Sequence, residues 1–81
     1  MNGEIQMHDV VVLAEDVRTE HFATHQPLLL RRGQLGTIVL DYPGNFFEVE
    51  FADQDGRTYA LLPLPAAKLI VLHDKPEIAA A

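Results

Sequence analysis

Residues 46–51 carry the clearest alternation of hydrophobic and polar positions in the chain, with Val49 lying between Glu48 and Glu50. Successive side chains of a β-strand point to opposite faces, so a two-residue repeat is typical of a strand with one buried and one wet face. We therefore predict a strand here, with its phenylalanine and valine side in the core and its acidic side in water.

Three apolar runs with β-branched residues predict further strands at 10–13, 37–40 and 69–72, and the segment 57–62, between a turn and a proline, predicts another. Turn-forming residues separate these runs. Pro43-Gly44 fits a type II turn, and Asp53–Gly56 is expected to reverse the chain. Pro63 and Pro65 should end the fourth strand, because proline cannot donate to a β-ladder. Residues 66–68 should then form one helical turn.

The connection from Ala14 to Gln34 is long for two neighbouring strands, which two to five residues usually join. A long first loop, a meander of hairpins and a helical turn before the last strand follow the order of an SH3-like barrel. We therefore predict an all-β fold, a small five-stranded SH3-like barrel with a long first loop and a short helical turn before the last strand. The alternative is a small α+β domain with a helix near residues 15–26.

This fold predicts which apolar side chains are buried. Val10-Val11-Val12-Leu13 is apolar on both faces, as a central strand would be. The glycines at 33, 36, 44 and 56 are expected in turns or close-packed junctions. The expected core residues are Val10, Val12, Leu35, Ile38, Leu40, Phe47, Val49, Phe51, Ala60, Leu62, Leu69 and Val71.

The chain of 81 residues is long enough for one small domain, which we place at residues 8–73 with flexible termini at 1–7 and 74–81. It has no apolar run of the ~18 residues that a membrane span needs. The first residues lack the basic and apolar segments of a secretion signal. We therefore expect a cytoplasmic protein.

The residue types of nucleophilic catalysis are scarce. The sequence holds no cysteine and no serine, and its threonines stand in no nucleophile motif. Glu48 and Glu50 lie on the expected wet face of a strand, where solvent would screen their charges. There is no glycine-rich phosphate loop. We therefore expect neither an enzyme nor a cofactor, and no small-molecule substrate is evident.

Two motifs resemble metal sites. His21 and His25 are four residues apart, which on a helix would place both rings on one face. Two imidazoles do not fill a coordination sphere, so we favour a solvated loop. Asp53-Gln54-Asp55-Gly56 resembles the start of a calcium loop, but a strand follows it instead of further oxygen ligands. We interpret it as a hairpin turn, and we expect no metal.

A basic pair, Arg31-Arg32, could bind a phosphate or a carboxylate. Twelve acidic against six basic residues give a net charge of −6, which opposes the approach of a polyanion. We therefore expect these arginines to pair with neighbouring carboxylates. The alternative function is RNA or nucleic-acid binding, with Tyr42, Phe46 or Tyr59 stacking on bases beside a patch of Arg31, Arg32, Arg57 and Lys68.

Two leucine-rich runs favour a protein-interaction module, which is the function we expect. Leu28-Leu29-Leu30 lies in the long connection, and residues 61–65 form a second run that alternation cannot entirely bury. Adjacent exposed leucines beside a sheet edge could bind a protein partner or drive self-association. Glu48 and Glu50 would then select a basic partner. Alternatively, Leu28–Leu30 folds back as a lid over an open end of the barrel.

Several segments carry a family resemblance, namely residues 9–16, Arg31–Val39, Phe47–Phe51 and Asp55–Leu62. Together they resemble a short bacterial family of a domain of unknown function, over residues 8–72. The resemblance implies no activity. Members of this family are similar in size and setting to small accessory or antitoxin-like proteins that are encoded beside a larger partner. The Gly-x-x-Gly-Thr-Ile-Val element at 33–39 is also similar to KOW-type SH3-like barrels, from which this chain departs by its acidity and by extra residues near 21–28.

Overall fold

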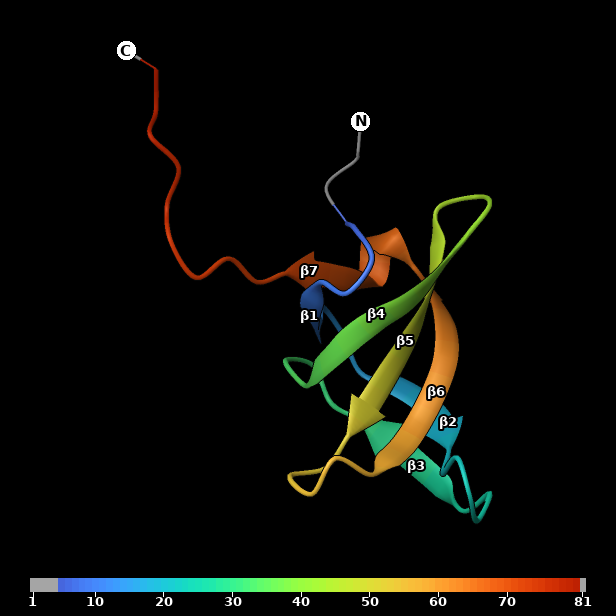
Figure 1. The fold of residues 1–81 in the computed structure, drawn as a ribbon. Coiled ribbons are helices and arrows are strands. Elements are labelled where there is room, and N and C mark those ends of the chain that lie inside the picture. Colours follow the sequence, from blue (N-terminus) through green and yellow to red (C-terminus); the bar gives the residue numbers. More distant parts are fainter. Residues whose placement is uncertain (1–4, 81) are drawn as a thin grey trace.

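The computed structural model describes residues 5–80, and nearly all of their regular structure is β (Figure 1). The predictions for residues 1–4 and 81 lie outside this range. The elements are β1 Val10–Leu13, β2 Val17–Glu20, β3 Pro27–Leu30, β4 Leu35–Tyr42, β5 Phe46–Ala52, β6 Thr58–Pro65, the 3₁₀ turn η1 Ala66–Lys68, and β7 Leu69–Val71. The all-β fold class is therefore confirmed.

The strands form two sheets. Five strands form an antiparallel sheet in the order β6-β5-β4-β1-β7, and the β2–β3 hairpin is a sheet of its own. The larger sheet is not closed, because β6 and β7 lie at its two edges. Figure 1 shows the hairpin crossing beneath the end where β6 begins. There the backbone N–H of Phe22 donates to the carbonyl of Tyr59 at 2.8 Å.

The long connection between β1 and β4 contains the β2–β3 hairpin, so the alternative of a helix near residues 15–26 is wrong. Val17 alternates with more polar neighbours and is buried, while Arg18 and Glu20 are exposed. That two-residue period suits a strand and leaves no apolar helical face. At the other end of the connection, Leu30 on β3 lies opposite Val17 and is 1% exposed.

The fourth predicted strand does not end before Pro63, since β6 continues through Pro65. The backbone N–H of Ala66 donates to the carbonyl of Asn45, and the register is regular from there to Phe51. The backbone groups of even-numbered β6 residues therefore bond to β5, while those of odd-numbered residues point away from β5, at the edge of the sheet. Proline is tolerated at such edge positions because no ladder bond is lost.

The core lies between the larger sheet and the hairpin. The prediction of Ile38, Phe47, Val49, Phe51, Ala60 and Leu69 as core residues is confirmed. Val12, Leu62 and Val71 are half-buried. The prediction is wrong for Val10, Leu35 and Leu40, which are exposed. In β1 the buried residues are Val11 and Leu13, so the strand turns its other face inward. In β4 the register shifts between Ile38 and Leu40, which moves Leu40 to the outside.

The glycines occupy the two kinds of position expected of them. Gly33, Gly44 and Gly56 have positive φ angles in the turns that precede β4, β5 and β6. Gly36 lies inside β4, buried against β5. The expectation of turns and a close-packed junction is therefore confirmed.

Candidate interaction surface

The side of the larger sheet that faces away from the core exposes large apolar side chains. Val12 lies opposite both Leu35 on β4 and Ile70 on β7, and directly paired residues share a face. Leu35 is 57% exposed and Ile70 is 51% exposed. We call this side the outer face, and its residues are Val10, Val12, Leu35, Thr37, Leu40, Tyr42, Phe46, Glu48, Glu50, Leu61, Ile70 and Leu72.

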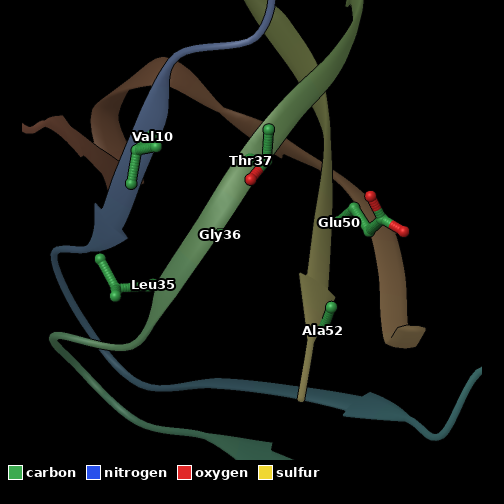
Figure 2. A pocket seen from close by; sticks show the side chains of 6 residues that line it. All are labelled: Val10, Leu35, Gly36, Thr37, Glu50 and Ala52. Carbon is green, nitrogen blue, oxygen red and sulfur yellow. The ribbon is translucent and has the colours of Figure 1, made fainter. Parts of the chain in front are cut away.

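A shallow hollow lies in the middle of the outer face. Figure 2 shows Val10 of β1 on one side of it and Glu50 and Ala52 of β5 on the other, with Leu35 at the start of β4, the strand between them. Thr37 and the backbone of Gly36 complete the lining. Its volume of about 210 Å³ is smaller than the clefts that enclose drug-sized ligands. The hollow therefore has room for side chains but not for a drug-sized ligand.

Two carboxylates stand among these apolar side chains. The hydroxyl of Tyr42 donates to Glu48 Oε1 at 2.8 Å, and the hydroxyl of Thr58 donates to Glu50 Oε2. The bond to Glu48 raises the pKa of the Tyr42 phenol, because ionised tyrosine could not donate it. Among residues 5–80, neither glutamate has a salt bridge. The outer face therefore presents fixed negative charge to its surroundings.

The three leucines of β3 lie in different environments. Leu30 is in the core, Leu28 is half-buried, and Leu29 is 44% exposed beside Arg18 of β2. Leu30 is therefore unavailable to a partner, and Leu29 lies on the small sheet, whereas Glu48 and Glu50 lie on the large one. The predicted leucine and glutamate residues do not form one sheet surface. Of the second leucine run, Leu61 reaches the outer face, opposite Glu50.

Two of the four cations of the predicted nucleic-acid patch, Arg31 and Lys68, form salt bridges with carboxylates. Arg31 Nε is 3.5 Å from Asp16 Oδ1, and Lys68 Nζ is 3.5 Å from Glu15 Oε2. Arg31 thus pairs with a carboxylate, as expected. Arg32 contributes its backbone N–H, which donates to Asp16 Oδ1 at 2.7 Å, and Arg57 follows the β5–β6 turn. The Glu15–Asp16 segment thus neutralises part of the patch.

The aromatic residues proposed to stack on bases are divided between the surface and the interior. Tyr42 and Phe46 are exposed on the outer face, paired across the β4–β5 hairpin. Tyr59 is half-buried, and its hydroxyl accepts a bond of 2.7 Å from Gln34 Nε2. Its ring centroid lies 6.4 Å from that of Phe51. Tyr59 therefore packs against the core.

The Asp16 carboxylate makes stability depend on pH. The Arg32 N–H and, to a smaller extent, the Arg31 guanidinium lower the pKa of Asp16, and desolvation only partly opposes them. Because the pKa of Asp16 is lower in the folded state, its ionised form stabilises the fold at pH values above the ordinary pKa of aspartate. This contribution is lost as the pH falls through the folded-state pKa. We expect the difference in unfolding midpoint between the wild type and Asp16→Ala to be full near neutral pH and to shrink below about pH 4. Thermal unfolding followed by circular dichroism across this range measures it, and a difference independent of pH would contradict it.

The two histidines of the metal-like motif lie in the turn between β2 and β3. His21 Nδ1 accepts backbone N–H bonds from Ala23 at 3.0 Å and from Thr24 at 3.3 Å, which fixes the turn. His25 has a φ of 66°, and its Nδ1 lies 3.4 Å from Glu20 Oε1. The helical spacing is therefore not realised. Residues 5–80 contain no cluster of three or more potential metal ligands.

The Asp53–Gly56 segment is the β5–β6 hairpin turn, as predicted. Asp53 Oδ1 accepts backbone N–H bonds from Asp55 at 2.9 Å and Arg57 at 3.0 Å. The Gly56 N–H donates to the carbonyl of Asp53. The Asp53 carboxylate thus holds the turn.

Sequence reasoning missed the apolar part of the outer face. Its exposed residues Val10, Leu35 and Leu40 were assigned to the core, and Ile70 was not singled out. The signal lay in the runs at 10–13 and 69–72, which are apolar at every position. Such runs predict either a strand buried on both faces or one with a second apolar face. Here the second face is open to solvent.

No helix among residues 5–80 is long and apolar enough to cross a membrane.

Comparison with known proteins shows which family the chain belongs to. The chain matches no curated protein and no solved structure. A family described as a domain of unknown function (DUF4926) matches residues 7–71, which is most of the chain and includes every strand described above. The protein therefore belongs to the DUF4926 family.

Proposed function

We propose that this domain is an SH3-like barrel that acts as a non-catalytic protein-interaction module. The order of elements supports the SH3-like assignment, with a long hairpin after the first strand, a three-stranded meander and a 3₁₀ turn before the last strand. The interaction role is carried by one observation. The outer face exposes large apolar side chains on adjacent strands, and contiguous patches of this kind are uncommon on monomeric proteins that bind nothing.

The charges on the outer face define the partner. Glu48 and Glu50 flank the apolar side chains, and neither has a salt bridge within residues 5–80. A partner segment with apolar side chains for the hollow and lysine or arginine for these carboxylates would complement both features. A second copy placed face to face would bring the glutamates of both chains together, which like-charge repulsion disfavours. A nucleic acid would meet the same negative charge.

Selection from a random peptide library displayed on phage, with the folded domain as bait, tests this proposal. We expect the enriched peptides to combine leucine or aromatic residues with lysine or arginine. Binding of one such peptide should weaken about tenfold in Glu50→Gln, which corresponds to the loss of one close charge pair. It should weaken further in Leu35→Ser, which removes an exposed wall of the hollow.

The matched control is Glu77→Gln, which makes the same charge change in the C-terminal tail, away from the sheet. It should bind the peptide like the wild type. Peptides that bind Glu50→Gln, Leu35→Ser and the wild type equally would contradict the proposal. Tight binding of single-stranded RNA that weakens steeply with salt would overturn it in favour of the nucleic-acid alternative.

A further inference from the structure

The free edge of the sheet at β7 offers backbone hydrogen-bonding groups. Leu72 donates to the carbonyl of Val10, and Ala14 donates to the carbonyl of Lys68, so even-numbered residues of this segment face β1. In an antiparallel ladder the intervening residues point the other way. The N–H and carbonyl of Val71 and the carbonyl of Leu69 therefore face outward. The N–H of Leu69 is already used, because it donates to Ala66.

The opposite edge, at β6, is closed to strand pairing. Its outward positions include Pro63 and Pro65, which have no N–H to donate, and the outward carbonyl of Tyr59 already accepts from Phe22. Proline on an edge strand is a common way in which proteins prevent edge-to-edge association. Among residues 5–80, no proline blocks the edge at β7, a strand of three residues whose middle residue, Ile70, is an exposed apolar residue, as is Leu72 just after it. Strand addition is therefore expected at β7.

We propose that β7 pairs antiparallel with β7 of a second copy of this chain, around a twofold axis at Val71. In this register the two Val71 residues exchange two N–H to carbonyl bonds. The carbonyl of Leu69 accepts from His73 of the second copy, and the symmetric bond forms at the other end. A register centred on Ile70 would require the N–H of Leu69, which is occupied. The backbone thus favours Val71 as the centre.

The side chains of this segment are self-complementary in the same register. Ile70, 51% exposed, lies opposite Leu72 of the second copy, itself 48% exposed, and the symmetry makes this contact twice. The next pair on this face of the sheet sets Lys68 of η1, whose Nζ is 3.5 Å from Glu15 Oε2, opposite Asp74 of the second copy, so the lysine would lie between two carboxylates. Moving the axis to Leu72 would set Ile70 opposite Asp74 instead. Both apolar and charged positions therefore select the axis at Val71.

The paired edges would join the outer faces of both copies. Leu35, Val12 and Ile70 lie on neighbouring strands of one copy, and Leu72 of the second copy would continue this band. The glutamates of β5 do not oppose the pairing, since β4 and β1 separate β5 from β7. The dimer would carry two outer faces side by side, so it is compatible with the proposed partner site and does not depend on it.

Sedimentation velocity over a range of protein concentrations tests the dimer. We expect the wild type to shift from 9.0 kDa towards twice that mass as concentration rises. Ile70→Lys should raise the dissociation constant at least about tenfold, since it replaces both apolar contacts with a charge. Val71→Pro should weaken the dimer too, because it removes the N–H that bonds to the second copy. The monomer should stay folded, because this N–H faces outward and the β1–β7 bonds are preserved. Leu61→Lys, at the other edge, is the control and should dimerise like the wild type.

Cross-linking tests the register. The chain has no cysteine, so single substitutions introduce unique thiols. Ile70→Cys and Leu72→Cys would face each other as a non-hydrogen-bonded pair, with Cα atoms about 4.5 Å apart, within reach of a disulfide. A mixture of the two variants should form the mixed disulfide well in excess of either homodimer. A wild type that stays monomeric, a dimer unaffected by Ile70→Lys while circular dichroism shows a folded variant, or no excess of the mixed disulfide would overturn the proposal.

Discussion

Leu30→Ala is expected to lower the free energy of unfolding by about 3 kcal/mol, whereas Leu29→Ala should change it by less than about 0.5 kcal/mol. The two leucines are adjacent on β3, but their side chains point to opposite faces of the hairpin. Leu30 is 1% exposed and belongs to the same buried cluster as Val17 and Leu13, while Leu29 is 44% exposed. Truncation of Leu30 removes buried methyl groups and leaves a cavity, but truncation of Leu29 only changes the surface.

This comparison decides what the three-leucine run does. A domain this small has a total stability of about 5 kcal/mol or somewhat more, so the loss at Leu30 would be a large fraction of it. Urea denaturation followed by circular dichroism gives both values, provided that the slope is the same in all three proteins. Equal losses in the two variants would mean that the β2–β3 hairpin does not pack on the sheet. A larger loss at Leu29 would contradict the assignment of faces.

The sequence was most informative where polar and apolar residues alternate. Residues 46–51 predicted β5 with the correct buried face, because the glutamates can be placed only on the wet side. The four apolar residues of β1 provide no such marker. Val11 rather than Val10 is buried because Val11 lies opposite Gly36 and Val71 on the core side. That pairing depends on partners distant in sequence, so local pattern could not reveal it.

Two features of the long strands were invisible for other reasons. The shift in register after Ile38 places Leu40 outside, and no residue type marks an irregularity of this kind. Pro63 and Pro65 were taken as strand ends, although proline is forbidden only where its nitrogen faces a partner strand. Whether a position faces the partner or the edge depends on register. Sequence alone therefore located the strands better than their limits.

The candidate surface was only partly predictable for the same reason. Glu48 and Glu50 were assigned to an exposed strand face, and they lie on the outer face. Their apolar neighbours come from strands far apart in sequence, such as Leu35 on β4 and Ile70 on β7. Each is an ordinary apolar residue in its own segment. Only the sheet order brings them together, and with them the contrast between a proline-blocked edge at β6 and an open edge at β7.

Gly36→Ala is expected to destabilise the domain by about 2–3 kcal/mol, through crowding rather than backbone strain. A Cβ at this position would lie 2.7 Å from Val49 Cγ1 and 2.9 Å from Phe51 Cε2. It would also lie 3.2 Å from the carbonyl oxygen of Glu50, which is backbone. Both side chains belong to the tightly packed core, where neighbours cannot yield without further loss. The added methyl group must therefore push β5 away from β4.

Two further variants separate this crowding from a general effect of replacing glycine. Gly33→Ala meets no atom within 4 Å but has a φ of +92°, so it should cost only about 1 kcal/mol of backbone strain. In the Val49→Ala background, the nearest clashing atom is gone, and Gly36→Ala should cost at least about 1 kcal/mol less than in the wild type. Urea denaturation of the four proteins in this cycle measures the coupling. Strict additivity of Gly36→Ala and Val49→Ala would show that the two positions do not touch, and would contradict the close approach of β4 and β5 on which the outer face depends.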